Sequence, residues 1–276
     1  MQSKNKQSKK SPKGIEHQVG RGPARVSQPH TQVEPGKPYL TERDGILALQ
    51  FNKWSTQSEM NIDGPDELVI PYTRVMMSFL LLAPSPGHVA MIGLGGGSLA
   101  KYCYRYLPDA DITVVEINPD VIALRNEFAI PADDARFRVL LGDGAAWVTD
   151  TASRPDVLIV DGFDADGLPA QLSSQRFYDD CCTALADNGI LVVNLWYGYP
   201  HHDECLARIS HSFSGNMVVV DAEDGFNNIV FAVKNTAFPP SASTIRHHAK
   251  SLCLSHPLNF QAQANKFVRA LPNNSN

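Results

Sequence analysis

Four apolar runs of this sequence each lead into residues that could do chemistry. The first run enters a turn of closely spaced glycines, and each of the next three is followed by an acid. These residues are Gly93, Gly95, Gly96 and Gly97 in the turn, and Glu116, Asp143 and Asp161 after the later runs. Ligands of parallel α/β sheets bind at the carboxyl ends of the strands. If the runs are parallel strands, the turn and the acids meet at one edge of a sheet.

The glycine turn and Glu116 have the spacing of a nucleotide-binding β-α-β unit, in which an acid follows the turn by about twenty residues. Glycines let the backbone turn sharply and approach a ligand without a Cβ in the way. A carboxylate at the tip of the neighbouring strand can accept both hydroxyl protons of a ribose. We therefore expect a ligand that carries adenosine. The alternative is that Glu116 only caps the next helix.

Asp161 and Asp164 are two carboxylates three residues apart, directly after the nearly apolar run 155–160. Their negative field could hold an ammonium group, and a carboxylate could accept its proton as the amine becomes a nucleophile. An amine that attacks a carbon beside a sulfonium needs this arrangement. The leaving group is already activated, so the protein supplies position, deprotonation and electrostatics. The alternatives are that the two acids shape the turn over residues 162–167, and that Asp143 is a helix N-cap.

The residue types that bind metals do not form a site of their own. No cluster of His, Cys and Asp has metal-ligand spacing, and we expect no metal. The histidine pairs at 201–202 and 247–248 are expected on the surface. The five cysteines show no C-x-x-C spacing, which argues against a structural zinc or a disulfide framework and favours a reducing cytoplasm.

Composition favours one large α/β core, because the chain has 276 residues of which 43% are hydrophobic. No apolar run approaches the roughly twenty residues of a membrane span, and residues 1–40 lack the apolar stretch of a secretory signal. We therefore expect a cytoplasmic location and no membrane partner. Residues 1–40 carry a net charge of +6, so the remainder of a chain with net charge −5 carries −11. An acidic body suits a cationic substrate and argues against nucleic acid as a partner.

The chain divides into four parts by composition. Residues 1–37 are rich in Lys, Ser, Gln, Pro and Gly, and predict a disordered basic tail, with contact to RNA or lipid as the alternative. Residues 38–82 predict short antiparallel strands and a linking helix begun by Pro71, too little for an independent domain. Residues 83–235 form the nucleoside-binding catalytic domain.

The fourth part, residues 236–276, is a C-terminal extension with a weak helical pattern, expected to pack loosely on the surface. The apolar residues of that pattern are Ile245, Leu252, Phe260 and Phe267. The apolar residues of the linking helix are instead expected in the core. These are Met76, Met77, Phe79 and Leu80.

Strands and helices alternate through the catalytic domain, which specifies a doubly wound α/β sheet. Seven strands are expected at 88–93, 111–116, 136–141, 155–160, 189–195, 216–221 and 228–234. Helices are expected at 97–107, 118–128, 144–151, 173–186 and 202–213. The connection between the last two strands is too short for a crossover helix, so this pair is antiparallel. The fold class is a mainly parallel, seven-stranded sheet of the Rossmann-like methyltransferase type with a small N-terminal β element.

Four segments of the sequence resemble the spermidine synthases (polyamine aminopropyltransferases), and the resemblance covers residues 40–235. The segments are IGLGGGSLAK (92–101), VVEINPDVI (114–122), LGDGAAWV (141–148) and DVLIVDGFDADGLPAQLSSQRFYDD (156–180). The last is the most specific, because it repeats the family's Asp-x-x-Asp, its Gly-Pro-like turn and its Phe-Tyr pair. The resemblance implies a class I S-adenosylmethionine-dependent transferase fold and a homodimer.

The resemblance implies a role for each residue around the donor. Glu116, next to Ile117, would hold the ribose hydroxyls, and Asp143 with Gly144 would hold the adenine. The cosubstrate would be decarboxylated S-adenosylmethionine, which leaves as methylthioadenosine after its aminopropyl group has been transferred.

On the acceptor side, the resemblance implies that Asp161 is the acid beside the attacking amine and that Asp164 anchors the acceptor. Gln57 and Tyr72 are candidates for the wall of the substrate pocket. The acceptor would be a small-molecule amine, for example the diamine putrescine, and the reaction would belong to polyamine biosynthesis.

The sequence departs from the family's pattern at three places. Gly96 stands where the family has an Asp that holds the donor's amine, the family's Tyr-Gln pair is Tyr72-Thr73, and a Pro-Thr-Tyr-Pro-Ser-Gly segment after the fifth strand is missing. Two alternative functions follow. Gly96 leaves room where the methionine carboxylate of intact S-adenosylmethionine would lie, which favours a methyltransferase. The missing segment favours a non-catalytic homologue that binds a nucleoside.

Overall fold

The computed structural model describes residues 37–52, 55–150, 152–163, 167–223, 225–234 and 238–271, all within one compact unit. The basic tail expected over residues 1–37 lies outside the described residues except for Lys37. None of the described helices is long and apolar enough to cross a lipid bilayer.

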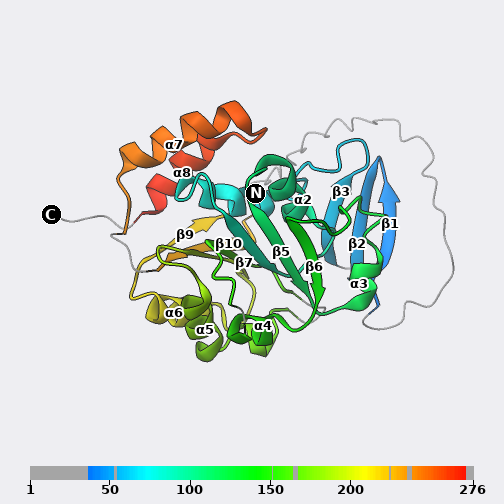
Figure 1. The fold of residues 1–276 in the computed structure, drawn as a ribbon, viewed down its shortest axis with the longest axis horizontal. Coiled ribbons are helices and arrows are strands. Elements are labelled where there is room, and N and C mark those ends of the chain that lie inside the picture. The colour runs from blue at the N-terminus through cyan, green and yellow to red at the C-terminus, as the bar shows by residue number, and fades with distance from the viewer. Residues whose placement is uncertain are drawn as a thin grey trace, which may run out of the picture. The chain divides into compact units, whose positions relative to one another are not determined.

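A seven-stranded sheet with the order β6-β5-β4-β7-β8-β10-β9 forms the centre of the described chain (Figure 1). Its strands are β4 (His88–Ile92), β5 (Asp111–Glu116), β6 (Phe137–Leu141), β7 (Val157–Val160), β8 (Ile190–Trp196), β9 (Met217–Asp221) and β10 (Asn227–Val233). The first five pair in parallel, and β10 runs antiparallel to both β8 and β9. The predicted doubly wound sheet with a reversed strand is therefore confirmed.

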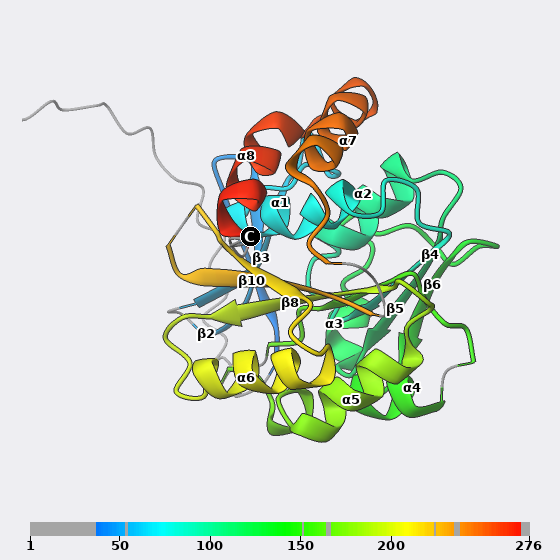
Figure 2. The same ribbon diagram turned by 90° about the vertical axis from the view of Figure 1, so that its left-hand side faces the viewer.

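Helices cover both faces of this sheet (Figures 1 and 2). The helices between strands are α2 (Ser98–Tyr106), α3 (Pro119–Ala123), α4 (Gly144–Asp150), α5 (Gln175–Ala184) and α6 (His202–Ser212). Alternate residues of one strand belong to different apolar clusters: Val89 and Met91 of β4 join the cluster on the α2 side, whereas Ala90 and Ile92 join the cluster on the α4–α6 side. This two-residue period on a strand buried on both faces explains its continuous apolar run.

The C-terminal extension is part of the core, so the prediction that it packs loosely was wrong. It forms α7 (Ala242–Ser255) and α8 (Phe260–Ala270), which pack on the sheet and on the 3₁₀ helix Met77–Leu81. The side chains of Ile245, Phe260 and Phe267 are fully buried. The ring of Phe267 lies 5.2 Å from that of Phe231 on β10.

A separate three-stranded antiparallel sheet precedes the main sheet, as predicted. Its strands are β1 (Tyr39–Arg43), β2 (Ile46–Asn52) and β3 (Ser55–Asn61). Asp44 and Gly45 join β1 to β2 with positive φ angles, which suits a tight hairpin turn. The linking segment that follows forms α1 (Pro71–Met76) and the 3₁₀ helix. The four residues expected in the core, Met76, Met77, Phe79 and Leu80, are fully buried.

Candidate functional site

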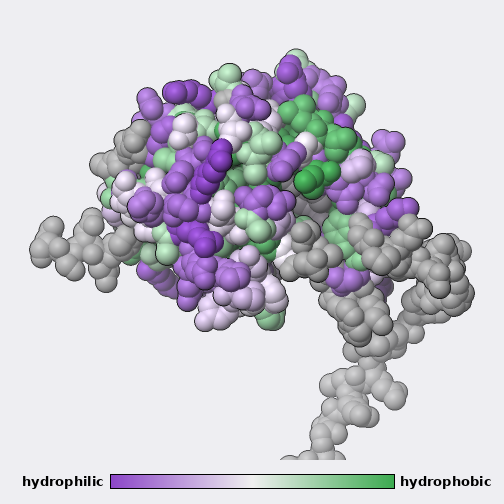
Figure 3. Space-filling model, turned by 90° about the horizontal axis from the view of Figure 1, so that it is seen from below, coloured by the Kyte–Doolittle hydropathy of each residue, from purple (hydrophilic) through white to green (hydrophobic). Residues whose placement is uncertain are grey.

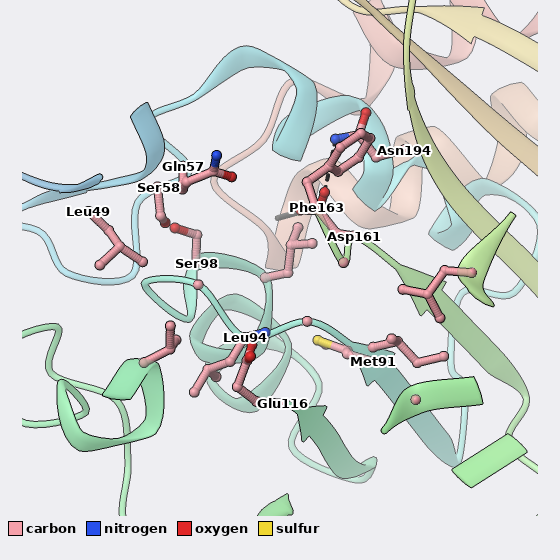
Figure 4. A pocket seen from close by; sticks show the side chains of 18 of the residues that line it. Leu49, Gln57, Ser58, Met91, Leu94, Ser98, Glu116, Asp161, Phe163 and Asn194 are labelled. Carbon is pink, nitrogen blue, oxygen red and sulfur yellow. Dashed lines mark hydrogen bonds between the residues drawn. The ribbon is translucent and has the colours of Figure 1, made fainter. Parts of the chain in front are cut away.

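A cavity of about 690 Å³ lies at the carboxyl ends of β4, β5, β7 and β8. Strands β2 and β3 and helix α1 form its opposite wall, so the small N-terminal sheet completes the site. Figure 4 shows Gln57, Ser58 and Ser98 together on one side, and Asp161 with Phe163 and Asn194 on another. Seen from the side toward which β5 and β6 end, the surface has an apolar area among hydrophilic residues (Figure 3).

The glycine turn begins at Gly93, where the chain leaves β4. Its φ of +97° is a backbone conformation that glycine adopts readily and other residues rarely do. A Cβ at this position would overlap the carbonyl of Asp161. Gly93 and Gly95 line the cavity together with Leu94, whose backbone faces Glu116. The turn therefore brings backbone into the cavity at the point where β4 and β7 are neighbours.

Gly96 lies behind this wall and is not among the described residues that line the cavity. A Cβ on Gly96 would lie 2.7 Å from both the Phe128 ring and the Ser58 hydroxyl. A Cβ on Gly97 would likewise lie 2.6 Å from the Ile130 side chain. These two glycines permit close packing behind the turn, and a direct role for either in ligand binding stays a prediction.

Phe128, which packs against Gly96, lies beyond the end of α3, and this helix is shorter than predicted. The helix expected over 118–128 ends at Ala123, and the chain then turns inward so that Phe128 is fully buried. The buried ammonium of Lys101 on α2 donates a 2.7 Å hydrogen bond to the Phe128 carbonyl. Burial lowers the pKa of Lys101 to about 8, against a smaller opposing effect of Asp66.

Glu116 ends β5 as a buried carboxylate with both oxygens held by the backbone. Leu94 N–H donates to Oε2 and Asn118 N–H donates to Oε1, both at 2.8 Å. Asn118 rather than Glu116 caps α3, because its side chain accepts from the Asp120 N–H. Each carboxylate oxygen retains a lone pair, so the group can still accept two hydroxyl protons. Ile117, next in the chain, is exposed and also lines the cavity.

Asp143 and Gly144 follow β6 and line the same cavity. Asp143 Oδ1 accepts a 2.8 Å hydrogen bond from Ala145 N–H in the first turn of α4. One oxygen of Asp143 therefore caps α4, as the alternative interpretation proposed. Asp143 also lies in the cavity wall, so a ligand contact is compatible with this cap. A Cβ on Gly144 would overlap the Ile92 side chain, so this helix start packs closely on β4.

Asp161 follows β7 and shares the cavity with Glu116. The Tyr72 hydroxyl donates to Oδ2 at 3.0 Å, and the Asn194 side-chain amide donates to Oδ1 at 2.9 Å. Burial raises the pKa of Asp161, and the hydrogen bonds from Asn194 and Tyr72 oppose that shift. Asp164, predicted beside it, lies outside the described residues.

Both predicted pocket-wall residues, Gln57 and Tyr72, do line the cavity. Sequence reasoning missed Asn194 and Asn227, which lie on β8 and β10 in the same wall. The signal for Asn194 was a single amide inside the apolar strand ILVVNLW. Its partner Asn227 becomes adjacent only through the antiparallel pairing of β8 with β10.

The described lining is acidic without a compensating base. Its carboxylates are Glu116, Asp143 and Asp161, and no Lys, Arg or His is among the described lining residues. No group of three or more His, Cys, Asp or Glu side chains in the described ranges could hold a metal ion. The arrangement can hold hydroxyl and ammonium groups, and Asp161 can exchange a proton.

The chain is similar in sequence to curated polyamine aminopropyltransferases. Polyamine aminopropyltransferases from Neisseria meningitidis serogroup A and Chromobacterium violaceum are 34% and 35% identical over 253 and 214 residues. The matches cover 89% and 77% of this chain, and 96% and 82% of those proteins.

Solved structures with the same fold include a probable spermidine synthase from Corynebacterium glutamicum, with a TM-score of 0.65, 20% identity and coverage of 87% of this chain and 93% of that one. A spermidine synthase in complex with the transition-state analogue AdoDATO has a TM-score of 0.65, 20% identity and 86% coverage of both chains. Human methyltransferase-like protein 13, in complex with SAH, has a TM-score of 0.61 and 22% identity, and the match covers 67% of this chain and 91% of that one.

The family model of the spermine/spermidine synthase domain matches residues 70–228, which contain the glycine turn and all three carboxylates of the cavity. This match spans more than half of the chain, and the bacterial relatives extend it over most of the remainder. The chain therefore belongs to the spermine/spermidine synthase family.

Proposed function

We propose that this chain is an aminopropyltransferase of polyamine biosynthesis, with decarboxylated S-adenosylmethionine as donor and a small primary amine as acceptor. Family membership supports the reaction class. The observation that carries the choice of donor is the charge of the cavity: three carboxylates and, among the described lining residues, no cationic side chain.

This charge favours a ligand that has positive groups and no carboxylate. Decarboxylated S-adenosylmethionine has a sulfonium and an ammonium, and both are stabilised by nearby carboxylates. Intact S-adenosylmethionine adds a carboxylate, and the described wall offers it no Lys, Arg or His to pair with. Glu116 would accept hydrogen bonds from the ribose hydroxyls, and Asp143 with Gly144 would contact the adenine.

Asp161 would act as the base for the acceptor. Its carboxylate takes a proton from the acceptor's ammonium, and the freed nitrogen lone pair attacks the methylene carbon bonded to sulfur. The N–C bond forms as the C–S bond breaks, and the C–S electron pair stays on sulfur as neutral methylthioadenosine. The proton then passes from Asp161 to solvent. Because burial raises the pKa of Asp161, its carboxylate is a better proton acceptor than an exposed one.

Methyl transfer from intact S-adenosylmethionine is the second candidate, based on the glycine at position 96. The space beside Gly96 is occupied by Phe128 and Ser58, so replacing the family's Asp with glycine opens no room for a methionine carboxylate there. The human methyltransferase-like neighbour supports the common fold alone. The geometry therefore favours aminopropyl transfer.

Donor identity tests the proposal directly. The purified chain is incubated with either donor and a panel of primary mono-, di- and polyamines, and products are identified by mass spectrometry. We expect methylthioadenosine and an aminopropylated amine with the decarboxylated donor, and no S-adenosylhomocysteine with the intact one. Methylation with the intact donor would refute the proposal. Binding of either donor without modification of any amine would instead support the non-catalytic alternative.

A further inference from the structure

A chain of side-chain amides leads from β10 to the carboxylate of Asp161. Asn227 Nδ2 donates to Asn194 Oδ1 at 2.8 Å, and Asn194 Nδ2 donates to Asp161 Oδ1 at 2.9 Å. Both side chains point to the same face of the antiparallel β8–β10 pair, because Asn227 is the register partner of Trp196 and Asn194 lies two residues before it. Asn194 is only 3% exposed.

Only one orientation of the Asn194 amide suits this environment. An amide has a donor end and an acceptor end, and its acceptor end facing Asp161 would place two oxygens together. With the donor end toward Asp161, the buried oxygen of Asn194 needs its own donor, and Asn227 supplies it. A buried acceptor without such a partner costs free energy.

Asp161 is held on two sides by these contacts. The Tyr72 hydroxyl from α1 donates to one oxygen and Asn194 from β8 donates to the other. The backbone N–H of Asp161 donates to Ile92 O, which fixes the base of the side chain. The other ionisable groups in the described cavity wall are the acids Glu116 and Asp143, and neither stabilises a negative charge on Asp161.

We propose that Asn194 is a positioning residue that keeps Asp161 ionised and oriented to receive the acceptor's proton, and that Asn227 fixes the amide of Asn194 for this purpose. The inference rests on the proposed aminopropyl transfer. It adds two residues that act on the reaction through Asp161 and not by contact with the substrates. A neutral amide suits the position, because a Lys or Arg there would compete for the carboxylate and repel the ammonium of the acceptor.

The closest test is Asn194→Asp, which keeps the shape of the side chain and the oxygen that Asn227 contacts but removes the donor. Two facing carboxylates raise the pKa of one of the pair. The acidic limb of the pH profile of kcat/KM, which reports the base of the free enzyme, should then move upward by at least about one pH unit. Below the limb, where kcat/KM falls tenfold per pH unit, such a shift lowers kcat/KM at least about tenfold, and the loss should disappear at higher pH.

Asn227→Leu provides a second variant on a less buried residue. It frees the Asn194 amide to rotate, so we expect an upward shift of the same limb that is smaller than in Asn194→Asp. The matched control is Asn228→Leu, on the same strand but with its side chain bonded to His202 and Asp221 on the other face. This control should leave the limb in place.

A readout without turnover separates this inference from the proposed function. Carbon-13 NMR of the aspartate carboxyls, assigned with Asp161→Asn, gives the Asp161 pKa in each variant directly. A raised pKa in Asn194→Asp and Asn227→Leu, with none in Asn228→Leu, supports the positioning role even if no amine is modified. An unchanged Asp161 pKa in a folded Asn194→Asp, or an equal shift in the control, overturns it.

Discussion

Neutral dipoles contact the carboxyl group of Asp161, because its described side-chain hydrogen-bond donors are the Tyr72 hydroxyl and the Asn194 amide. Burial opposes ionisation, and the two hydrogen bonds favour it. A carboxylate balanced in this way can accept a proton from an amine and release it again. Glu116 differs, because both of its oxygens are held by backbone N–H groups, and its proposed role is to accept hydrogen bonds from the ribose hydroxyls.

These different environments predict different effects of mutation. Asp161→Asn removes the proton acceptor, so kcat should fall by about 10²- to 10⁴-fold. Donor affinity, measured by calorimetry with decarboxylated S-adenosylmethionine, should stay within about tenfold because the nucleoside contacts lie at other strand ends.

Glu116→Ala provides the contrast at the nucleoside end of the cavity. It should weaken donor binding by about 1.5–3 kcal/mol through lost charged hydrogen bonds. Full turnover by Asp161→Asn, or a larger loss of donor affinity in Asp161→Asn than in Glu116→Ala, would contradict the assigned roles.

At the scale of elements, the sequence predicts well what depends on one strand and its own loop. Glu116, Asp143 and Asp161 each follow a recognisable apolar run, and parallel strands bring such positions to one edge. Contacts between elements are harder to predict. Asn194 and Asn227 lie on strands whose pairing sets their proximity, and nothing in either segment alone indicates it.

The early end of α3 was hard to predict for the same reason, because it too involves contacts between elements. Residues 118–128 favour a longer helix, but α3 ends at Ala123, and Phe128 beyond it packs behind the glycine turn with its carbonyl hydrogen-bonded to Lys101. Tertiary packing outweighs the weak preference of this segment for helix. Gly96 therefore reflects the packing of Phe128, which follows α3, and of Ser58 on β3 against the turn. An alignment of sequences alone would interpret this glycine as a lost acid.

This interpretation predicts that Gly96 is needed for stability. Gly96→Ala places a methyl group against Phe128 and Ser58, so the free energy of unfolding should fall by about 1–3 kcal/mol. Gly142→Ala is the matched control, because its Cβ would meet Val115 at an ordinary 3.8 Å. Urea unfolding of both variants measures the difference. An equal effect of the two substitutions would show that the space behind the turn is not filled as described.

At the scale of the whole described chain, the cavity depends on parts that are distant in sequence. Strands β2 and β3 supply one wall, the ends of β5, β6 and β7 supply the acids, and β10 supplies Asn227. Helix α8 packs on the face of β10 that also carries Asn227, with Phe267 against Phe231, and both C-terminal helices contact the 3₁₀ helix that follows α1 (Figure 2). Tyr72 on α1 and Asn227 on β10 therefore both lie on elements connected to the C-terminal helices, although those helices contribute no described residue to the cavity.

The C-terminal helices should consequently contribute to stability as core elements. Phe267 is fully buried against Phe231, and Phe267→Ala should lower the free energy of unfolding by about 3–5 kcal/mol. Leu254→Ala on α7 is the control, because that side chain is 90% exposed and its loss should change stability by less than about 0.5 kcal/mol. Urea denaturation followed by circular dichroism compares them. If the helices only rested on the surface, both substitutions would be nearly neutral, whereas a core role requires that Phe267→Ala alone shifts the midpoint.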